Sequence, residues 1–108
     1  MSTESGDRAT FRSIWEQHRP QTFARIDALD RAAALAAEGR LSAEERDQAR
    51  REAHTLAGSV AFFGFLEGSR IAAELEEFFL STSAPDPEWL RERLAKLRGA
   101  LEGLPYTF

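Results

Sequence analysis

The chain has 108 residues, a formal net charge of −4 and no cysteine, and these features exclude several classes of protein. The length fits one domain with a modest core. Without cysteine there are no disulfides or cysteine-based zinc sites, and an acidic chain offers no basic stripe for nucleic acid. No apolar run approaches the roughly 18 residues of a membrane-spanning helix, and residues 1–10 do not form a signal peptide. We therefore expect residues 1–108 to be one complete, soluble, cytoplasmic and monomeric domain.

The composition favours helices, because alanine, leucine, glutamate and arginine dominate and β-branched residues are sparse. A short first helix is predicted from about residue 7 to residue 18. Its apolar edge consists of Phe11, Ile14 and Trp15. Pro20 either begins a second helix in its first turn or kinks one continuous helix. The second helical segment extends to about Glu38, and Gly39 is a natural C-terminal stop.

The apolar row of this second segment contains one charged residue. The row consists of Phe23, Ile26, Asp30, Ala33 and Ala37. Because Asp30 interrupts the row, we expect the buried face to be displaced toward Leu29.

Three more helices are predicted in the second part of the chain. Ser42 and Glu45 form a capping box for a helix over about residues 42–63, which ends near Gly64. The next helix spans about residues 66–80, and a loop follows over residues 81–85. Asp86 and Pro87 then read as the N-cap and first residue of the last helix. Its apolar positions are Leu90, Leu94, Leu97 and Leu101. These elements predict an all-α, antiparallel up-down-up-down four-helix bundle with an additional short N-terminal helix.

The helix over residues 42–63 carries a histidine beside a patch of small residues. At about 100° per residue, Leu56 points about 200° away from His54, and the core stripe lies on the side of Leu56. His54 therefore faces outward. The residues that follow on its own face are Ala57, Gly58 and Ala61. A glycine inside a helix costs roughly 1 kcal/mol relative to alanine, and Gly58 has a functional explanation if it clears space for a partner to reach the imidazole.

This arrangement resembles the histidine-containing phosphotransfer (HPt) domain family of bacterial two-component phosphorelays. The signature of that family is a histidine, an aliphatic residue two positions on, a Lys-Gly-small sequence and a second glycine at the helix end. The matching residues are His54, Leu56, Gly58, Ser59 and Gly64. In the following helix, Ile71, Leu75 and Glu76 occupy the positions of apolar residues followed by an acid or amide. The chain departs from the pattern at Ala57, where the family usually has lysine.

The resemblance implies that His54 accepts a phosphoryl group and relays it to or from the aspartate of a response-regulator receiver domain. A sensor histidine kinase would be the second partner, and the receiver would supply Mg²⁺, so no cofactor or metal site is expected in this chain. The sequence contains no glycine-rich phosphate-binding loop of the kind that binds ATP, so we expect a phosphoryl carrier and not an enzyme. Glu76 is the candidate that orients the imidazole; its alternative is a solvated carboxylate. His18 lacks a comparable setting.

Because position 57 is alanine, another residue would have to offset the charge of the phosphate on His54. Arg50 and Arg51 lie one turn before His54 and are within reach of it. The alternative is that both are ordinary solvated arginines paired with Asp47 or Glu44. The docking face is expected to combine the three small residues beside His54 with an apolar edge at Phe62 or Phe65.

Two rival functions remain. A degenerate HPt domain would bind receivers without phosphotransfer, and only the missing lysine favours this hypothesis. A helical-bundle metalloprotein usually needs Glu-x-x-His pairs on two helices, whereas this chain has two histidines, His18 and His54, that are 36 positions apart.

Overall fold

Four helices make up the fold. The computed structural model describes residues 3–81 and 86–103, with side chains from Thr10 onward. The helices are α1 (Thr3–Ala37), α2 (Ala43–Phe62), α3 (Leu66–Leu80) and α4 (Pro87–Ala100), and no strand occurs in these ranges. The predicted all-α fold is therefore confirmed.

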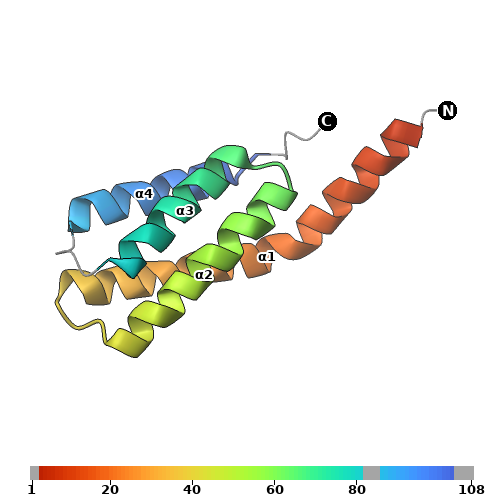
Figure 1. The fold of residues 1–108 in the computed structure, drawn as a ribbon. Coiled ribbons are helices and arrows are strands. Elements are labelled where there is room, and N and C mark those ends of the chain that lie inside the picture. Colours follow the sequence, from red (N-terminus) through yellow and green to blue (C-terminus); the bar gives the residue numbers. More distant parts are fainter. Residues whose placement is uncertain (1–2, 82–85, 104–108) are drawn as a thin grey trace.

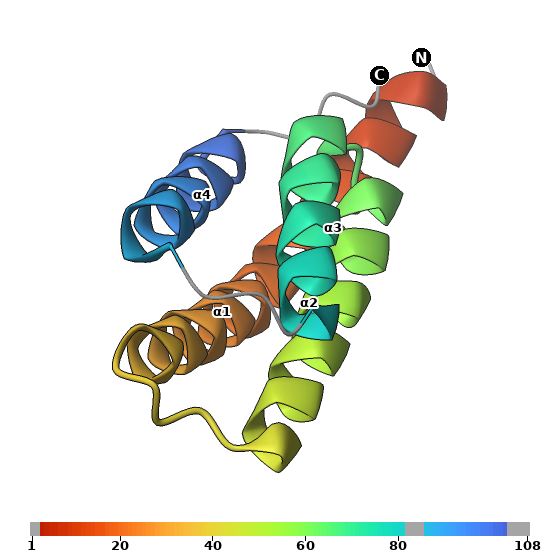
Figure 2. The ribbon, with the colours of Figure 1, turned by 60° about the vertical axis from the view of Figure 1, so that its left-hand side comes forward.

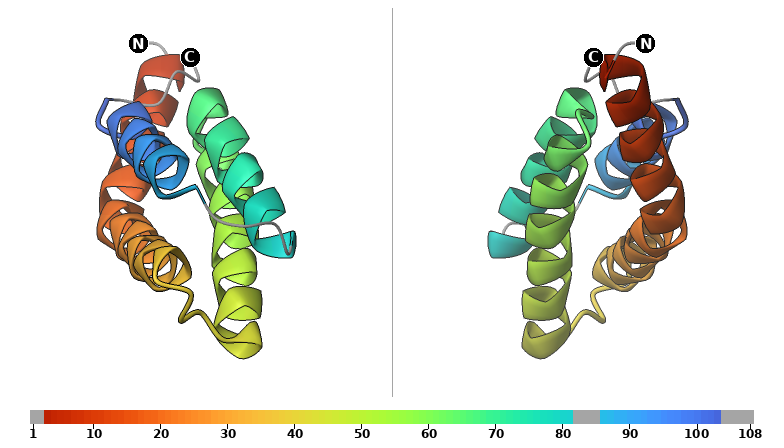
Figure 3. Two further views of the ribbon diagram at one scale, coloured as in Figure 1. Left: turned by 90° about the vertical axis from the view of Figure 1, so that its left-hand side faces the viewer. Right: turned by 90° about the vertical axis from the view of Figure 1, so that its right-hand side faces the viewer.

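The four helices form an antiparallel bundle in which each helix packs against two others. The packed pairs are α1 with α2, α2 with α3, α3 with α4, and α1 with α4. Each helix runs opposite to the one before it (Figures 1 and 2). Figure 3 shows α1 beside α4 on one side of the bundle and α2 beside α3 on the other. Such up-and-down connectivity follows from short connections between amphipathic helices.

The expected short N-terminal helix does not form a separate element. The residues assigned to it belong to α1, which continues through Pro20. A proline lacks the amide hydrogen of one helical bond and so bends a helix without necessarily ending it, and Figure 1 shows α1 changing direction about halfway along. Trp15 before the proline and Ile26 after it are both fully buried, so packing holds both halves in one helix.

The core lies between the four helices and contains most residues of the predicted apolar rows. Ile14, which is 38% exposed, and Ala37, which is exposed at the end of α1, were wrongly predicted as part of these rows. Leu29 is fully buried, whereas Asp30 is half-buried and pairs with Arg98 of α4. Arg98 also contacts Asp27 at 2.7 Å, so the polar edge of α1 is tied to α4. The expected displacement of the buried face toward Leu29 is confirmed. The leucines at the core positions of α4 are buried: Leu90, Leu94, Leu97 and Leu101.

The helix ends follow the predicted capping signals. The N–H of Glu45 bonds the Ser42 hydroxyl at 3.0 Å, and the N–H of Ser42 bonds the Glu45 carboxylate at 2.9 Å, which completes the capping box. Gly39 and Gly64 have φ values of 68° and 88°, the left-handed conformation that ends a helix. Asp86 accepts bonds from two amides at the start of α4. Residues 82–85 of the predicted loop lie outside the described residues.

The capping box makes a testable contribution to stability. Ser42→Ala should lower the free energy of unfolding by about 1 kcal/mol, because it leaves the amide of Glu45 without its acceptor. For a domain of this size the melting temperature should fall by about 4 °C. Ser13→Ala is the matched control, because Ser13 is exposed in the middle of α1. Equal melting temperatures for the two variants would contradict the role of the cap.

The capping box also predicts a dependence on pH. The hydrogen bonds from Ser42 hold the pKa of Glu45 below its ordinary value of 4.5. This carboxylate therefore stabilises the fold above that pH, and its contribution is lost as the pH falls through the lowered pKa.

Candidate functional site

His54 lies in the second half of α2 with its imidazole in solvent. Its side chain is 71% exposed, whereas Ala53 and Leu56 on either side are fully buried. The helical repeat accounts for this contrast, because residues one and two positions away point toward the core when His54 points outward. The side chain is therefore accessible to another protein.

Glu76 of α3 holds one nitrogen of this imidazole. Its Oε2 lies 3.0 Å from Nδ1 of His54, and its side chain is 21% exposed. An ionised carboxylate can only accept a hydrogen bond, so Nδ1 carries the proton when the ring is neutral. The lone pair then belongs to Nε2. This nitrogen is the nucleophilic position of the ring.

Helices α2 and α3 pack against each other, and each carries small side chains near His54 and Glu76. Ala53 of α2 and Ala72 of α3 are fully buried. The hydroxyl of Ser69 donates a 2.8 Å hydrogen bond to the backbone carbonyl of Ala57. In the sequence, Ser69 is one of the small residues on the face of Glu76, seven positions before it, which allows this face to approach another helix closely. Its hydrogen bond to Ala57 was not predicted.

The surface beyond His54 is open. Gly58 is exposed, and Ala57 and Ala61 are half-buried. A Cβ atom added to Gly58 would meet no heavy atom within 4 Å. Packing inside the domain therefore does not require glycine at this position, and the free space faces solvent.

Arg50 and Arg51 both pair with Asp47, which lies one turn before them. Arg50 contacts Asp47 Oδ1 at 3.2 Å, and Arg51 contacts Oδ2. The hydrogen bond from Arg51, assisted by that from Arg50, holds the pKa of Asp47 below its usual value. The structure thus has the ion-paired arrangement that the sequence left as one of two alternatives. Both guanidinium groups nevertheless lie on the helix turn that precedes His54.

Of the two candidate apolar edges, only Phe62 is on the surface. Its side chain is 67% exposed, and its ring lies 5.7 Å from that of Phe11. The interpretation of Phe65 as a surface residue is wrong, because it is 2% exposed and packs 4.7 Å from Trp15. The turn at Gly64 directs the chain inward before α3 begins. Leu66, which is 74% exposed, was not predicted as part of the apolar surface.

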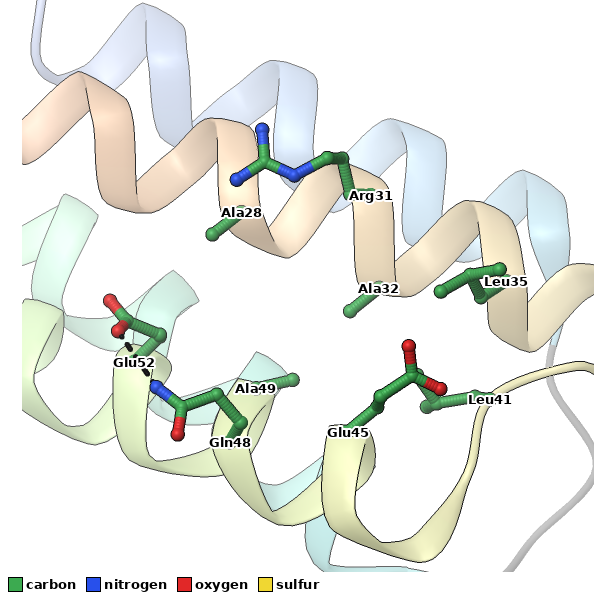
Figure 4. Close-up of a pocket in the computed structure, with 9 residues that line it drawn as sticks. All are labelled: Ala28, Arg31, Ala32, Leu35, Leu41, Glu45, Gln48, Ala49 and Glu52. Atoms are coloured by element: carbon green, nitrogen blue, oxygen red, sulfur yellow. Dashed lines mark hydrogen bonds between the residues drawn. The ribbon is translucent and has the colours of Figure 1, made fainter.

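A groove elsewhere on the molecule does not involve His54. It encloses about 280 Å³ between α1 and α2, and its floor is mostly aliphatic (Figure 4). Glu52 at its edge bonds Gln48 of the same helix and pairs with Arg25 of α1 at 2.8 Å.

The described parts of the chain contain no cluster of three or more His, Cys, Asp or Glu side chains suited to a metal ion. They also contain no helix long and apolar enough to cross a membrane.

Comparison with known proteins identifies the family. The family model of the Hpt domain matches residues 13–105, which include His54, Glu76 and all four helices in whole or in part. No curated protein and no solved structure matches the chain. The match covers well over half of the sequence and agrees with the helical bundle that presents an exposed histidine. The chain belongs to the Hpt domain family, the histidine phosphotransfer domains of two-component phosphorelays.

Proposed function

We propose that His54 accepts a phosphoryl group on Nε2 and relays it to or from the aspartate of a response-regulator receiver domain. The observation that carries this proposal is the 3.0 Å contact between His54 Nδ1 and Glu76 Oε2 beside an open surface. One ring nitrogen is held, and the other is free to react. A sensor histidine kinase is the second partner that we propose.

The transfer is a displacement at phosphorus. The lone pair of Nε2 attacks the phosphorus of an aspartyl phosphate, the new P–N bond forms, and the P–O bond to the aspartate breaks as the carboxylate leaves. Nδ1 keeps its proton, so the ring becomes positively charged in the transition state. The carboxylate of Glu76 stabilises this charge. The reverse step returns the phosphoryl group to a receiver aspartate.

The receiver would bring the Mg²⁺ and the acidic pocket, so this chain needs no cofactor of its own. The proposed docking face contains the exposed ring of Phe62 and the small residues around His54, which are Ala57, Gly58 and Ala61. Arg50 and Arg51 are available to the phosphoryl oxygens if a guanidinium leaves Asp47, because both lie within one turn of the imidazole.

The alternative is a docking module without phosphotransfer. The alanine at position 57, where the family usually has lysine, is the observation that favours it. The contact between His54 and Glu76 favours transfer, because a domain that only docked would have no need to hold the imidazole by one nitrogen.

The role of His54 is tested by substitution. His54→Gln should abolish formation of acid-labile, base-stable phosphate when the protein is incubated with a phosphorylated receiver domain or with phosphoramidate. The melting temperature should change little, since the side chain is exposed. His18→Gln is the control and should keep full labelling, because His18 lies near the middle of α1, where its ring is 5.5 Å from that of Phe63. Labelling that persists in His54→Gln but disappears in His18→Gln would contradict the proposal.

The role of Gly58 is access to the imidazole. Gly58→Ala should raise the free energy of unfolding by roughly 1 kcal/mol, the difference in helix propensity, and should slow transfer from the receiver. Gly58→Glu should slow it further, because it adds bulk and negative charge beside the phosphoryl group. Gly68→Ala is the contrasting variant: its Cβ would lie 3.0 Å from Leu101 Cδ2, so no gain in stability is expected. Unchanged transfer in both Gly58 variants would refute the access argument.

The alanine at position 57 tunes transfer without preventing it. Ala57→Lys would place an ammonium group one turn from the imidazole, and a partly exposed charge contact is worth roughly 0.2–1 kcal/mol. We therefore expect the yield of phosphohistidine to change by less than about tenfold. Phosphate exchange with one receiver domain, measured for both proteins, provides the comparison. An inert native protein that Ala57→Lys activates would favour the docking alternative.

A further inference from the structure

The contact between His54 and Glu76 depends on the spacing of two helices. Both residues extend from helix backbones, and a carboxylate on α3 reaches an imidazole on α2 only when the two axes are close. Among the described residues, His54 is the only hydrogen-bond partner of the Glu76 side chain. No second bond on Glu76 therefore fixes where its carboxylate lies.

Polar bonds join α2 and α3 on both sides of this contact. At one end Arg46 Nη1 donates to the carbonyl of Ser81 at 2.8 Å. Toward the other end the Ser69 hydroxyl donates to the carbonyl of Ala57 at 2.8 Å. Arg46 acts through a long side chain that can follow a shift of the helices. Serine acts through a single Cβ, so its bond to a main-chain carbonyl constrains the separation of the two backbones directly.

Ser69 is also placed to act on both members of the pair. It precedes Glu76 by seven residues, so the two side chains leave α3 from the same face, two turns and about 10 Å apart. Its acceptor, Ala57, follows His54 by three residues on α2. The hydrogen bond from Ser69 to the carbonyl of Ala57 therefore constrains the separation of α2 and α3 near the imidazole of His54.

We propose that Ser69 is a positioning residue that holds α3 against the main chain of α2, so that Glu76 keeps the proton of His54 on Nδ1 and leaves Nε2 free to react. This inference rests on the proposed phosphotransfer for its purpose. Its geometric part concerns the imidazole alone and can be measured without any partner.

The variant that tests this is Ser69→Ala. It removes the donor but leaves no buried group unpaired, because an interior helical carbonyl such as that of Ala57 also accepts the amide four residues on. The domain should therefore stay folded. Thr22→Val is the matched control: Thr22 is a buried hydroxyl on α1 that donates to the carbonyl of His18 at 3.1 Å, away from α3.

Two quantities are measured for the native protein, Ser69→Ala, Thr22→Val and Glu76→Ala. Nitrogen-15 chemical shifts of His54 give the ratio of its Nδ1–H and Nε2–H tautomers at a pH where the ring is neutral. Phosphoramidate then serves as a small phosphoryl donor: its P–N bond breaks as the bond from Nε2 to phosphorus forms, and ammonia leaves.

We expect Ser69→Ala to shift the tautomer ratio toward that of Glu76→Ala by about fivefold, the effect of one net hydrogen bond, and to slow phosphorylation by a similar factor. Thr22→Val should match the native protein in both measurements. A native ratio in Ser69→Ala, or an equal shift in Thr22→Val, would overturn the positioning role. A shifted ratio in Ser69→Ala with no phosphorylation of the native protein would instead overturn the proposed function and leave the positioning role intact.

Discussion

The close packing of α2 on α3 is the constraint on which the site depends. Helices that face each other with alanine, glycine and serine can approach nearer than helices lined with leucine, because the side chains at the contact set the interaxial distance. Here Ala53 of α2 and Ala72 of α3 are fully buried, and the hydroxyl of Ser69 on α3 bonds the main chain of α2. That proximity lets one carboxylate extend across to His54 while the imidazole stays in solvent. A bulky residue at this interface would separate the donor and the acceptor even if both were retained.

On the face away from His54, α2 is held by contacts with α1. Glu52 projects from the face of α2 opposite to His54 and pairs with Arg25 of α1. Just after the C-terminal end of α2, the rings of Phe63 and Phe65 pack against Trp15 of α1, with centroid distances of 5.2 Å and 4.7 Å. These contacts keep α2 from turning about its own axis. The direction of the imidazole is thus set by residues that never touch it.

For the phosphotransfer that we propose, the site orients the imidazole of His54 but adds little of its own for binding a phosphoryl group. Arg50 and Arg51, one turn before His54, share the single carboxylate of Asp47, and the surface beyond the imidazole consists of small side chains. A carrier must release what it accepts, and strong binding of the phosphorylated state would oppose the second transfer. On the proposed function, such a site would leave the stabilisation of phosphate charge to the receiver domain, while Glu76 orients the imidazole.

The sequence by itself determined the helical class, nearly all of the helix ends and the outward direction of His54. These features follow from local rules: a capping box at Ser42, glycines in the left-handed conformation, and a repeat of about 3.6 residues that places Leu56 and His54 on different faces. Tertiary structure decided what depends on distant contacts. Burial of Trp15 and Ile26 on either side of Pro20 keeps α1 continuous. The turn after Phe62 exposes that ring and buries Phe65, although the two aromatic residues are locally alike. The bond from Ser69 to Ala57 could not be foreseen either, because its acceptor is a main-chain carbonyl, which every residue has, and only the packing of two helices selects one of them.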